Sequence, residues 1–523
     1  MIRSDARRFY ALRKARPVAG KSNGPVDRHV EREEHHPMNY VTQADRMLIG
    51  GELVHASNGA FDLSIDPATE EVIGRVPRAT VEDVDRAIRA ADAAWPEWFA
   101  LTPLARSRAM RDFGKALRAR SEEILKVEVA DTGNTITPMR GDVGFAVDSL
   151  DYYAGLAHEL KGQTIPSTHE NLHITLREPY GVVVRIAPFN HPLMFAVART
   201  AAALAAGNAI VVKAPETSPL SAMILSQIAR DALPPGIFNV VTGDGRTVGN
   251  ALVQHPLVKR IAFIGSPQTG RAIQRAAAEV GVKHVSLELG GKNPFIAFPD
   301  VDPERIAEAA VRGMNFAWQG QSCGSTSRLL VHADIYDAVL ERVVEKVRAI
   351  RLGDPQSPET GMGPVNSRVQ LEKVLSFFES AKTDGARLMT GGKRPDGPMF
   401  ERGYWVEPTV YADVEPGMRL WQEEVFGPIL SVGKWRSFEE AVEKANSTEY
   451  GLTAAVWTND INDALRMVRK IRAGHTWING SSAHFIGVPF GGMKSSGIER
   501  EEGIEEMLGY TETKTINIML PKG

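Results

Sequence analysis

The sequence contains very little cysteine, and this scarcity already excludes some classes of protein. Cys323 is the only cysteine in 523 residues, so the chain cannot form an intrachain disulfide, and nothing indicates an oxidising compartment. The sequence also lacks an excess of charge of either sign, because the formal net charge is −3. Nucleic acid and acidic membranes are therefore not expected as partners, and we expect a cytoplasmic protein.

Long apolar runs are lacking as well. The most apolar stretch, residues 193–212, contains Arg199 and Asn208 and is rich in alanine and glycine. This composition is typical of a packed helix followed by a buried strand and not of a membrane span. No internal repeat or low-complexity tract follows residue 40. The length predicts about three domains.

The N-terminal segment differs from the rest of the sequence. Residues 1–37 are polar, with basic residues crowding the start and acidic residues the end. They contain no apolar core of a secretory signal, so export is not expected. We expect a disordered leader over residues 1–46, with translation from Met38 as an alternative.

Two regions alternate short β-branched runs with helical stretches. In the first, helical segments such as 221–233 separate four candidate strands, at 181–187, 209–212, 238–241 and 260–264. This alternation predicts a parallel sheet with helices on both faces. The second region begins with a strand at 294–298 and contains a helix at 335–350.

Three further elements lie outside these two regions. A helix is predicted at 80–95, where Thr80 and Asp83 form an N-cap signature. Residues 173–179 and 515–520 are typical of exposed strands. Exposed strand edges invite pairing with another chain, so we expect an oligomer.

The single cysteine lies among small and polar residues, in the stretch GQSCGSTS. A lone cysteine is commonly a small buried apolar residue, and the alternative is a nucleophile that a substrate can reach. Glu288 precedes it by 35 positions, in LELGGKNP. A carboxyl group of raised pKa there would activate the water that releases an acyl group from sulfur, whereas its ordinary role is that of a solvated loop residue.

Asn190 ends a predicted strand in IAPFNHPL. The ordinary interpretation is a helix boundary, because asparagine and then Pro192 are favourable at a helix start. The functional interpretation is an amide that donates to a developing oxyanion.

Polar and glycine-rich loops follow three of the predicted strands. Ligands of parallel sheets bind beyond the carboxyl ends of the strands, where helix N-termini offer free amides to phosphate, so these loops suit a dinucleotide. The segment from Gly243 to Gly249 is a stretched version of the usual glycine-rich fingerprint. An acidic group beside a ribose disfavours a 2′-phosphate, which favours NAD without excluding NADP. The loop residues concerned are Lys213, Glu216, Gly245, Gly249 and Ser266.

Four motifs together resemble one family, the NAD(P)-dependent aldehyde dehydrogenases. LELGGKNP, GQSC, EEVFGPIL and PFGGMKSSG occur in the family's order and spacing, and the resemblance extends from about residue 48 to the C-terminus. It implies an α/β fold with a Rossmann-like cofactor domain, a second α/β catalytic domain and a small β oligomerisation arm. The expected boundaries are 47–158 with 180–289 for the cofactor domain, 290–508 for the catalytic domain, and 159–179 with 509–523 for the arm.

The resemblance also implies roles for individual residues in the oxidation of an aldehyde to an acid. Cys323 is similar to the catalytic nucleophile, Glu288 to the general base for deacylation, and Asn190, with the backbone N–H of Cys323, to the oxyanion hole. The resemblance assigns no role to Lys292 and implies no metal. It further implies a homodimer or homotetramer and a set of cofactor contacts: Lys213 and Glu216 at the adenosine ribose, Ser266 at the pyrophosphate, Glu424 at the nicotinamide ribose and Phe426 near the nicotinamide ring.

Three departures from the family pattern concern the substrate. His191 and Ala198 stand where many relatives carry aromatic residues, and residues 479–487 differ as well. We expect a bulky hydrophobic or aromatic aldehyde.

Three other functions stay open at this point. A CoA-acylating dehydrogenase would release the acyl group to a thiol, although relatives of that type generally lack a base at the position of Glu288. A cysteine hydrolase or acyltransferase without redox chemistry would need His284 or His475 beside the thiol. A non-catalytic binding protein with this fold is the third.

Overall fold

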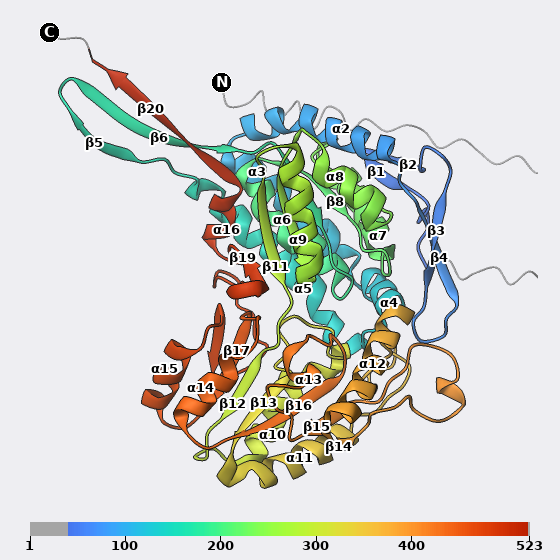
Figure 1. Cartoon of the computed structure of the whole chain (residues 1–523). Helices are drawn as coiled ribbons and strands as arrows, with labels where there is room; N and C mark the ends of the chain where they lie inside the picture. Colours follow the sequence, from blue (N-terminus) through green and yellow to red (C-terminus); the bar gives the residue numbers. More distant parts are fainter. Residues whose placement is uncertain (1–39, 521–523) are drawn as a thin grey trace, which may run out of the picture. The chain divides into compact units, whose positions relative to one another are not determined.

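The structure is a computed structural model and describes residues 40–520 (Figure 1). Most of its strands belong to two large sheets. The first sheet has the strand order β19-β11-β10-β7-β8-β9-β1-β2. Its strands are β1 (Met47–Ile49), β2 (Glu52–Val54), β7 (Val182–Ile186), β8 (Ala209–Lys213), β9 (Phe238–Val241), β10 (Val258–Gly265), β11 (His284–Leu289) and β19 (Gly497–Ile498).

The five central strands of this sheet, β11-β10-β7-β8-β9, are parallel. The chain runs from β7 outward to β9 and then returns to β10 on the other side of β7. The strand order therefore reverses between β7 and β10, and such a switch point is where open α/β sheets bind ligands. The four strands that the sequence predicts in this region are confirmed, as is the α/β class.

Helices cover both faces of the first sheet (Figure 1). The crossover helices α6 and α7 pack together, and α8 packs against both α9 and α2, as right-handed crossovers on two opposite faces require. The helices of this part are α2 (Val81–Ala100), α3 (Pro103–Ala119), α4 (Ser121–Thr132), α5 (Ile136–Leu156), α6 (Pro192–Ala206), α7 (Leu220–Ala232), α8 (Asn250–Gln254) and α9 (Pro267–Val280).

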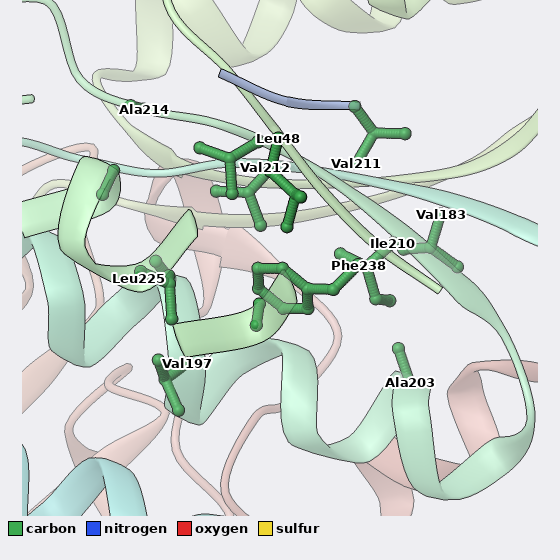
Figure 2. Packing of buried hydrophobic residues seen from close by; sticks show 14 of the residues in the cluster. Leu48, Val183, Val197, Ala203, Ile210, Val211, Val212, Ala214, Leu225 and Phe238 are labelled. Atoms are coloured by element: carbon green, nitrogen blue, oxygen red, sulfur yellow. The ribbon is translucent and has the colours of Figure 1, made fainter. Parts of the chain in front are cut away.

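The core of this part is aliphatic. Figure 2 shows Ile210, Val212 and Phe238 of the strands together with Val197 and Leu225 of α6 and α7. All of these side chains are at most 2% exposed. Because β-branched residues fill both faces of strands buried on both sides, the valine-rich runs form strands here and not helices. The helix predicted at 80–95 is α2, and Thr80 and Asp83 form its capping box.

The second sheet has the order β14-β15-β16-β13-β12-β17-β18. Alternate residues of β12 serve two separate cores, Phe295 on one face and Ile296 on the other, as the two-residue period of a strand dictates. Its strands are β12 (Pro294–Ala297), β13 (Arg328–His332), β14 (Arg387–Thr390), β15 (Thr409–Ala412), β16 (Ile429–Trp435), β17 (Thr453–Trp457) and β18 (His475–Ile478). The helices of this part are α10 (Pro303–Gly313), α11 (Tyr336–Arg348), α12 (Arg368–Asp384), α13 (Arg419–Gln422), α14 (Phe438–Asn446) and α15 (Ile461–Lys470). Helix α16 (Ile504–Gly509) comes later in the chain and packs against α6 of the first part.

Two connections join the sheets. Residues 290–293 lead directly from β11 in the first sheet to β12 in the second. Near the end of the chain β19 returns and pairs antiparallel with β11, so that Gly497 lies opposite Glu288. The end of β11 is therefore held from both sheets.

The two strands predicted as exposed edges pair with one another. Thr511–Met519 (β20) runs antiparallel to Asn171–Pro179 (β6), from Thr511 opposite Pro179 to Met519 opposite Asn171. The other edge of β6 pairs with Thr164–Thr168 (β5). The expectation of an open edge at 173–179 is therefore wrong, because β6 is the middle strand, while β5 and β20 are the edges. A separate hairpin joins β3 (Phe61–Ile65) to β4 (Val72–Pro77).

The predicted leader over residues 1–46 lies mostly outside the described residues. Its last part, residues 40–46, is described, and there Val41 and Ala44 are 2% and 6% exposed and belong to the first core. These residues therefore pack with the folded chain, in contrast to the expectation of disorder up to residue 46. Within residues 40–520, no helix has the length and apolar character needed to cross a membrane.

Candidate active site

Cys323 lies in the loop that precedes β13 and is half-buried. The amide of Asn293 holds this loop, because Nδ2 donates to the carbonyl oxygens of Cys323 at 2.7 Å and Ser325 at 2.9 Å. Gly320 has φ +65°, and a Cβ atom there would lie 2.3 Å from the Gly427 carbonyl oxygen. The glycine is therefore required by conformation and by space.

Glu288, on β11, faces the cysteine. Cys323 Sγ donates to Glu288 Oε2 over 3.8 Å, and the Glu288 side chain is buried. Burial, together with the charge of Glu501, raises the pKa of Glu288 to about 8. Burial and then the charge of Glu288 also hold the pKa of the Cys323 thiol well above its usual value. Because ionising both groups would place two like charges in contact, the ionisation of either group opposes the ionisation of the other.

The source of a low thiol pKa was left open by the sequence. The structure places a proton acceptor beside the sulfur, and among the described residues no cation contacts Sγ. The second carboxylate oxygen of Glu288, Oε1, has no hydrogen-bond partner in the same part of the chain. This oxygen is available to a water molecule while Oε2 faces the sulfur.

Asn190 follows β7 and lies against the same loop. Its side-chain Nδ2 donates to the backbone carbonyl oxygen of Gln321 at 2.9 Å. The backbone carbonyl oxygen of Asn190 accepts from Asn134 Nδ2 at 2.7 Å. The N-cap of α6 is His191 and not Asn190, so the amide is not spent on capping a helix. Since an amide nitrogen carries two hydrogens, one hydrogen of Asn190 Nδ2 has no acceptor among the described residues.

The loops after β8 and β9 are tied together by Glu216. Its Oε1 accepts from the backbone N–H of Gly245 at 2.7 Å and lies 3.5 Å from Lys213 Nζ. Burial is the first cause of the lowered pKa of Lys213. The Gly245 N–H is thus already bonded, and Gly249 ends a π-helical turn, Gly245–Gly249, that continues into α8. Contact of these two glycines with a phosphate stays a prediction.

Ser266 caps the next helix of the sheet. Its side chain accepts from the backbone N–H of Thr269 at the start of α9. The residue follows β10, on one side of the switch point, and Asn190 follows β7 on the other. A helix N-terminus at this position offers its free amides to a phosphate.

Glu424 and Phe426 come from the second sheet and meet residues of the first. Glu424 Oε1 accepts from the Gly291 N–H at 2.9 Å, and a Cβ atom at Gly290 would lie 2.1 Å from Glu424 Oε2. The glycines of LELGGKNP therefore permit the approach of this carboxylate, whose pKa is raised by burial. Phe426 packs edge-on against Phe189, the neighbour of Asn190, with ring centroids 5.6 Å apart.

A buried ionic cluster lies near Glu288, and the sequence analysis did not predict it. Arg185 of β7 donates to Glu501 at 2.8 Å, and Arg199 of α6 lies 3.0 Å from Glu501 and 2.5 Å from Glu502. The sequence contained a signal for this cluster, because Arg185 interrupts an otherwise apolar strand and a buried arginine needs an acidic partner.

Asn293, which holds the cysteine loop, was also not predicted as a site residue, although it belongs to the motif LELGGKNP. Lys292 of that motif is buried, and its Nζ has no hydrogen-bond partner in residues 40–520.

The two histidines that a hydrolase would use lie elsewhere. His284 is at the start of β11, four residues from Glu288 along an extended strand, and its ring packs at a tilt of 45° against Tyr180. His475 packs between Trp477 and Phe490, with Nδ1 3.3 Å from the Pro489 carbonyl oxygen. The described structure gives neither ring a hydrogen bond to Cys323, so the hydrolase interpretation lacks its base.

The fold and site together define an α/β enzyme with a dinucleotide-type sheet and a cysteine–glutamate pair at its edge. The sequence model described as "Aldehyde dehydrogenase family" matches residues 55–516. The chain belongs to the aldehyde dehydrogenase family, as the four motifs predicted.

Individual relatives agree with this assignment. The chain is 44% identical over 464 residues to the aldehyde dehydrogenase tropH of Talaromyces stipitatus, covering 87% of this chain and 90% of that protein. A putative aldehyde dehydrogenase from Burkholderia cenocepacia has a similar structure, with a TM-score of 0.89 and 39% identity. The match covers 91% of this chain and 97% of that chain. An aldehyde dehydrogenase from Bacillus cereus, solved as an NAD+ complex, matches with a TM-score of 0.88 and 38% identity. The match covers 91% of this chain and 96% of that chain. The predicted fold class and enzyme class are therefore confirmed.

Proposed function

We propose that this enzyme oxidises an aldehyde to a carboxylic acid with NAD+, through a covalent intermediate on Cys323. The observation that carries the proposal is the 3.8 Å contact of Cys323 Sγ with the buried carboxylate of Glu288. The amide of Asn190 lies against the same loop. Acyl transfer through a cysteine requires a nucleophile, a base and an oxyanion donor close together. Here all three groups belong to or contact the loop that contains Cys323.

The residues act in a fixed order. The thiol loses its proton to solvent, and the sulfur forms a bond to the aldehyde carbon, whose oxygen becomes an alkoxide. Asn190 Nδ2 and the Cys323 N–H donate to this alkoxide, and the loss of one proton and two electrons from the substrate carbon leaves a thioester. Glu288 then takes a proton from water, whose oxygen attacks the thioester carbon. The carbon–sulfur bond breaks, the acid leaves, and the sulfur regains its proton.

NAD+ fits the switch point of the first sheet. Glu216 stands at the end of β8 with Lys213, and the carboxylate is suited to accept ribose hydroxyls. Ser266 at the start of α9 would receive the pyrophosphate, and Glu424 and Phe426 the nicotinamide half. When bound, NAD+ supplies the acceptor for the electrons and hydrogen that leave the substrate carbon. The Bacillus cereus relative, solved with NAD+, supports this assignment, and NADP+ stays an alternative.

The test of the proposed function is cofactor reduction followed by absorbance. NAD+ and NADP+ are crossed with short aliphatic, long aliphatic, aromatic and charged aldehydes, each with and without CoA. We expect CoA-independent reduction and release of the free acid. Reduction that requires CoA would replace the proposal with a CoA-acylating dehydrogenase, and cofactor binding without any reduction would favour a binding protein.

We further propose a bulky hydrophobic or aromatic substrate. Ala198 is a small residue on α6, and the rings of Phe195 and Trp318 pack against His191, with centroids 5.9 and 5.2 Å away. These aromatic surfaces next to Asn190 suit a flat apolar group. Turnover of acetaldehyde far better than of benzaldehyde would contradict this part of the proposal.

A homodimer or homotetramer is also proposed. The edge strands β5 and β20 present unpaired backbone groups, and Ile165, Ile518 and Met519 are exposed there, Met519 to 72%. Exposed apolar strand edges are pairing surfaces. Light scattering of the purified chain measures this assembly directly.

Replacing Asn190 by alanine is expected to lower kcat by about 10² to 10³, the usual cost of one oxyanion donor. The KM of the aldehyde should change little, because the amide binds the alkoxide more tightly than the carbonyl oxygen. Steady-state kinetics beside Asn134→Ala, which removes a bond to the backbone of residue 190 but no proposed donor, provide the comparison. Equal losses in both variants would mean that Asn190 only supports the loop.

Replacing Glu216 by alanine is expected to lower the NAD+ over NADP+ ratio of kcat/KM by about tenfold or more, because the carboxylate that repels a 2′-phosphate is lost. Glu372→Ala, an exposed carboxylate on α12, is the matched control. An unchanged ratio in Glu216→Ala would show that another group selects the cofactor.

A further inference from the structure

Two histidines beside the active site are each fixed by a buried carboxylate. His191 Nδ1 lies 2.7 Å from Asp142 Oδ2, and His484 Nδ1 lies 2.9 Å from Glu502 Oε1. Asp142 and Glu502 are 6% and 3% exposed. Neither Nε2 atom has a hydrogen-bond partner within residues 40–520. Both rings thus have one nitrogen held by the protein and one nitrogen left for another molecule.

The two histidines belong to one aromatic group. Asp142 and Phe145 are one turn apart on α5; Asp142 pairs with His191, and Phe145 packs edge-on against His484 with centroids 6.5 Å apart. On α6, Phe195 contacts His191, and Arg199 one turn later binds Glu502, the partner of His484. Helices α5 and α6 therefore hold both rings at the same end of the site.

This group lies next to the reacting atoms. His191 directly follows Asn190, the proposed oxyanion donor. Its ring also contacts Trp318, which belongs to the segment leading to Cys323, with centroids 5.2 Å apart. The indole N–H of Trp318 is buried and has no hydrogen-bond partner in the described part of the chain. An apolar substrate would leave these polar groups unpaired, and an unpaired buried polar group is costly.

The protonation of the rings decides which substrate group fits. A carboxylate only accepts hydrogen bonds, so Nδ1 of each histidine carries a hydrogen. Nε2 then accepts a hydrogen bond when the ring is neutral and donates one when the ring is charged. Burial disfavours the charged form of His191, but the charge and hydrogen bond of Asp142 outweigh it and raise the pKa. A hydroxyl group satisfies Nε2 in both states, because it both donates and accepts.

We propose that His191 and His484 are specificity-determining residues that select an aromatic aldehyde carrying a hydroxyl group. The inference rests on the proposed function and narrows its substrate class. Phe145, Phe195 and Trp318 pack against the substrate ring. The hydroxyl group bonds to Nε2 of a histidine whose orientation Asp142 or Glu502 fixes.

The test compares size-matched substrates. The ratio of kcat/KM for 3- or 4-hydroxybenzaldehyde to that for the matching methylbenzaldehyde is measured in the wild type, His191→Phe and His484→Phe. Phenylalanine keeps a ring in place but removes both nitrogens. We expect a wild-type ratio of about tenfold or more for at least one isomer, since sites that bond a hydroxyl group reject the analogue lacking it. The ratio should approach one in at least one variant, with KM of the hydroxylated aldehyde carrying most of the change.

His255→Phe is the control, because this histidine also pairs with an aspartate, Asp85 at 3.1 Å, but lies in the β9–β10 connection, between α8 and β10. It should keep the wild-type ratio. Oxidation of all four aldehydes at similar efficiency, or a preference that persists in both histidine variants, would overturn this inference and leave the proposed function intact. Failure of every aldehyde to reduce NAD+ would overturn both.

Discussion

Replacing Cys323 by alanine is expected to abolish aldehyde-dependent NAD+ reduction, with a loss of at least about 10⁴-fold, the scale seen when a covalent nucleophile is removed. The physical reason is that no other residue in the described part of the chain offers a thiol, so the covalent bond to the aldehyde carbon cannot form. Absorbance at saturating aldehyde and NAD+ measures the loss.

The alanine variant should still bind NAD+, because the proposed cofactor contacts lie on the loops after β8 and β10 and in residues 424–426. Quenching of tryptophan fluorescence by NAD+ tests this and separates lost chemistry from lost folding. Cys323→Ser keeps a hydroxyl group of similar size and should be almost as inactive, because an alcohol is far less acidic than a thiol. Activity within tenfold of the wild type in either variant would contradict a covalent role for Cys323.

Replacing Glu288 by glutamine is expected to slow acid release by roughly 10² to 10⁴-fold, the contribution typical of a positioned general base. The sulfur would still acquire an acyl group, so NAD+ should be reduced about once per active site in a rapid burst and then slowly. Rapid mixing with the aldehyde resolves the burst from the steady state. A variant with normal steady-state turnover would show that water is activated elsewhere.

The pH profile provides the control for this variant. The base must be ionised, and burial raises the pKa of Glu288 to about 8. Wild-type deacylation should therefore increase as the pH rises through that value, since the carboxylate becomes more populated. The glutamine variant should lose this increase, whereas Glu372→Gln on the exposed face of α12 should keep it. An increase that survives in Glu288→Gln would assign the titration to another group.

Much of the fold could be predicted from the sequence because it depends on local patterns. The β-branched runs before Lys213 and Ser266 form parallel strands buried on both faces. Thr80 and Asp83 formed the capping box that starts α2. In the site, the family resemblance implied that Glu288 and Cys323 act together, and the structure places Cys323 Sγ 3.8 Å from Glu288 Oε2, while their catalytic roles stay predictions.

The remaining features depend on contacts between distant segments, which a local pattern does not encode. β6 pairs with β20 across more than 330 residues, so an apparent edge strand became a middle strand. Arg185 and Glu501 are 316 positions apart and form a buried pair only because β19 returns to β11. The carboxylate partners of His191 and His484 come from α5 and from residue 502. The distance in sequence between each histidine and its carboxylate does not predict that they form a hydrogen bond.

The central claim is that Cys323 carries the substrate as a thioester that water, directed by Glu288, releases as an acid. Mass spectrometry of Glu288→Gln, quenched in acid after mixing with NAD+ and benzaldehyde in the absence of CoA, tests it most directly. We expect a stoichiometric mass increase that corresponds to one benzoyl group in place of the thiol hydrogen, located on the peptide that contains Cys323. NAD+ reduction without any acyl group on that peptide would show that the oxidation does not pass through a thioester on Cys323.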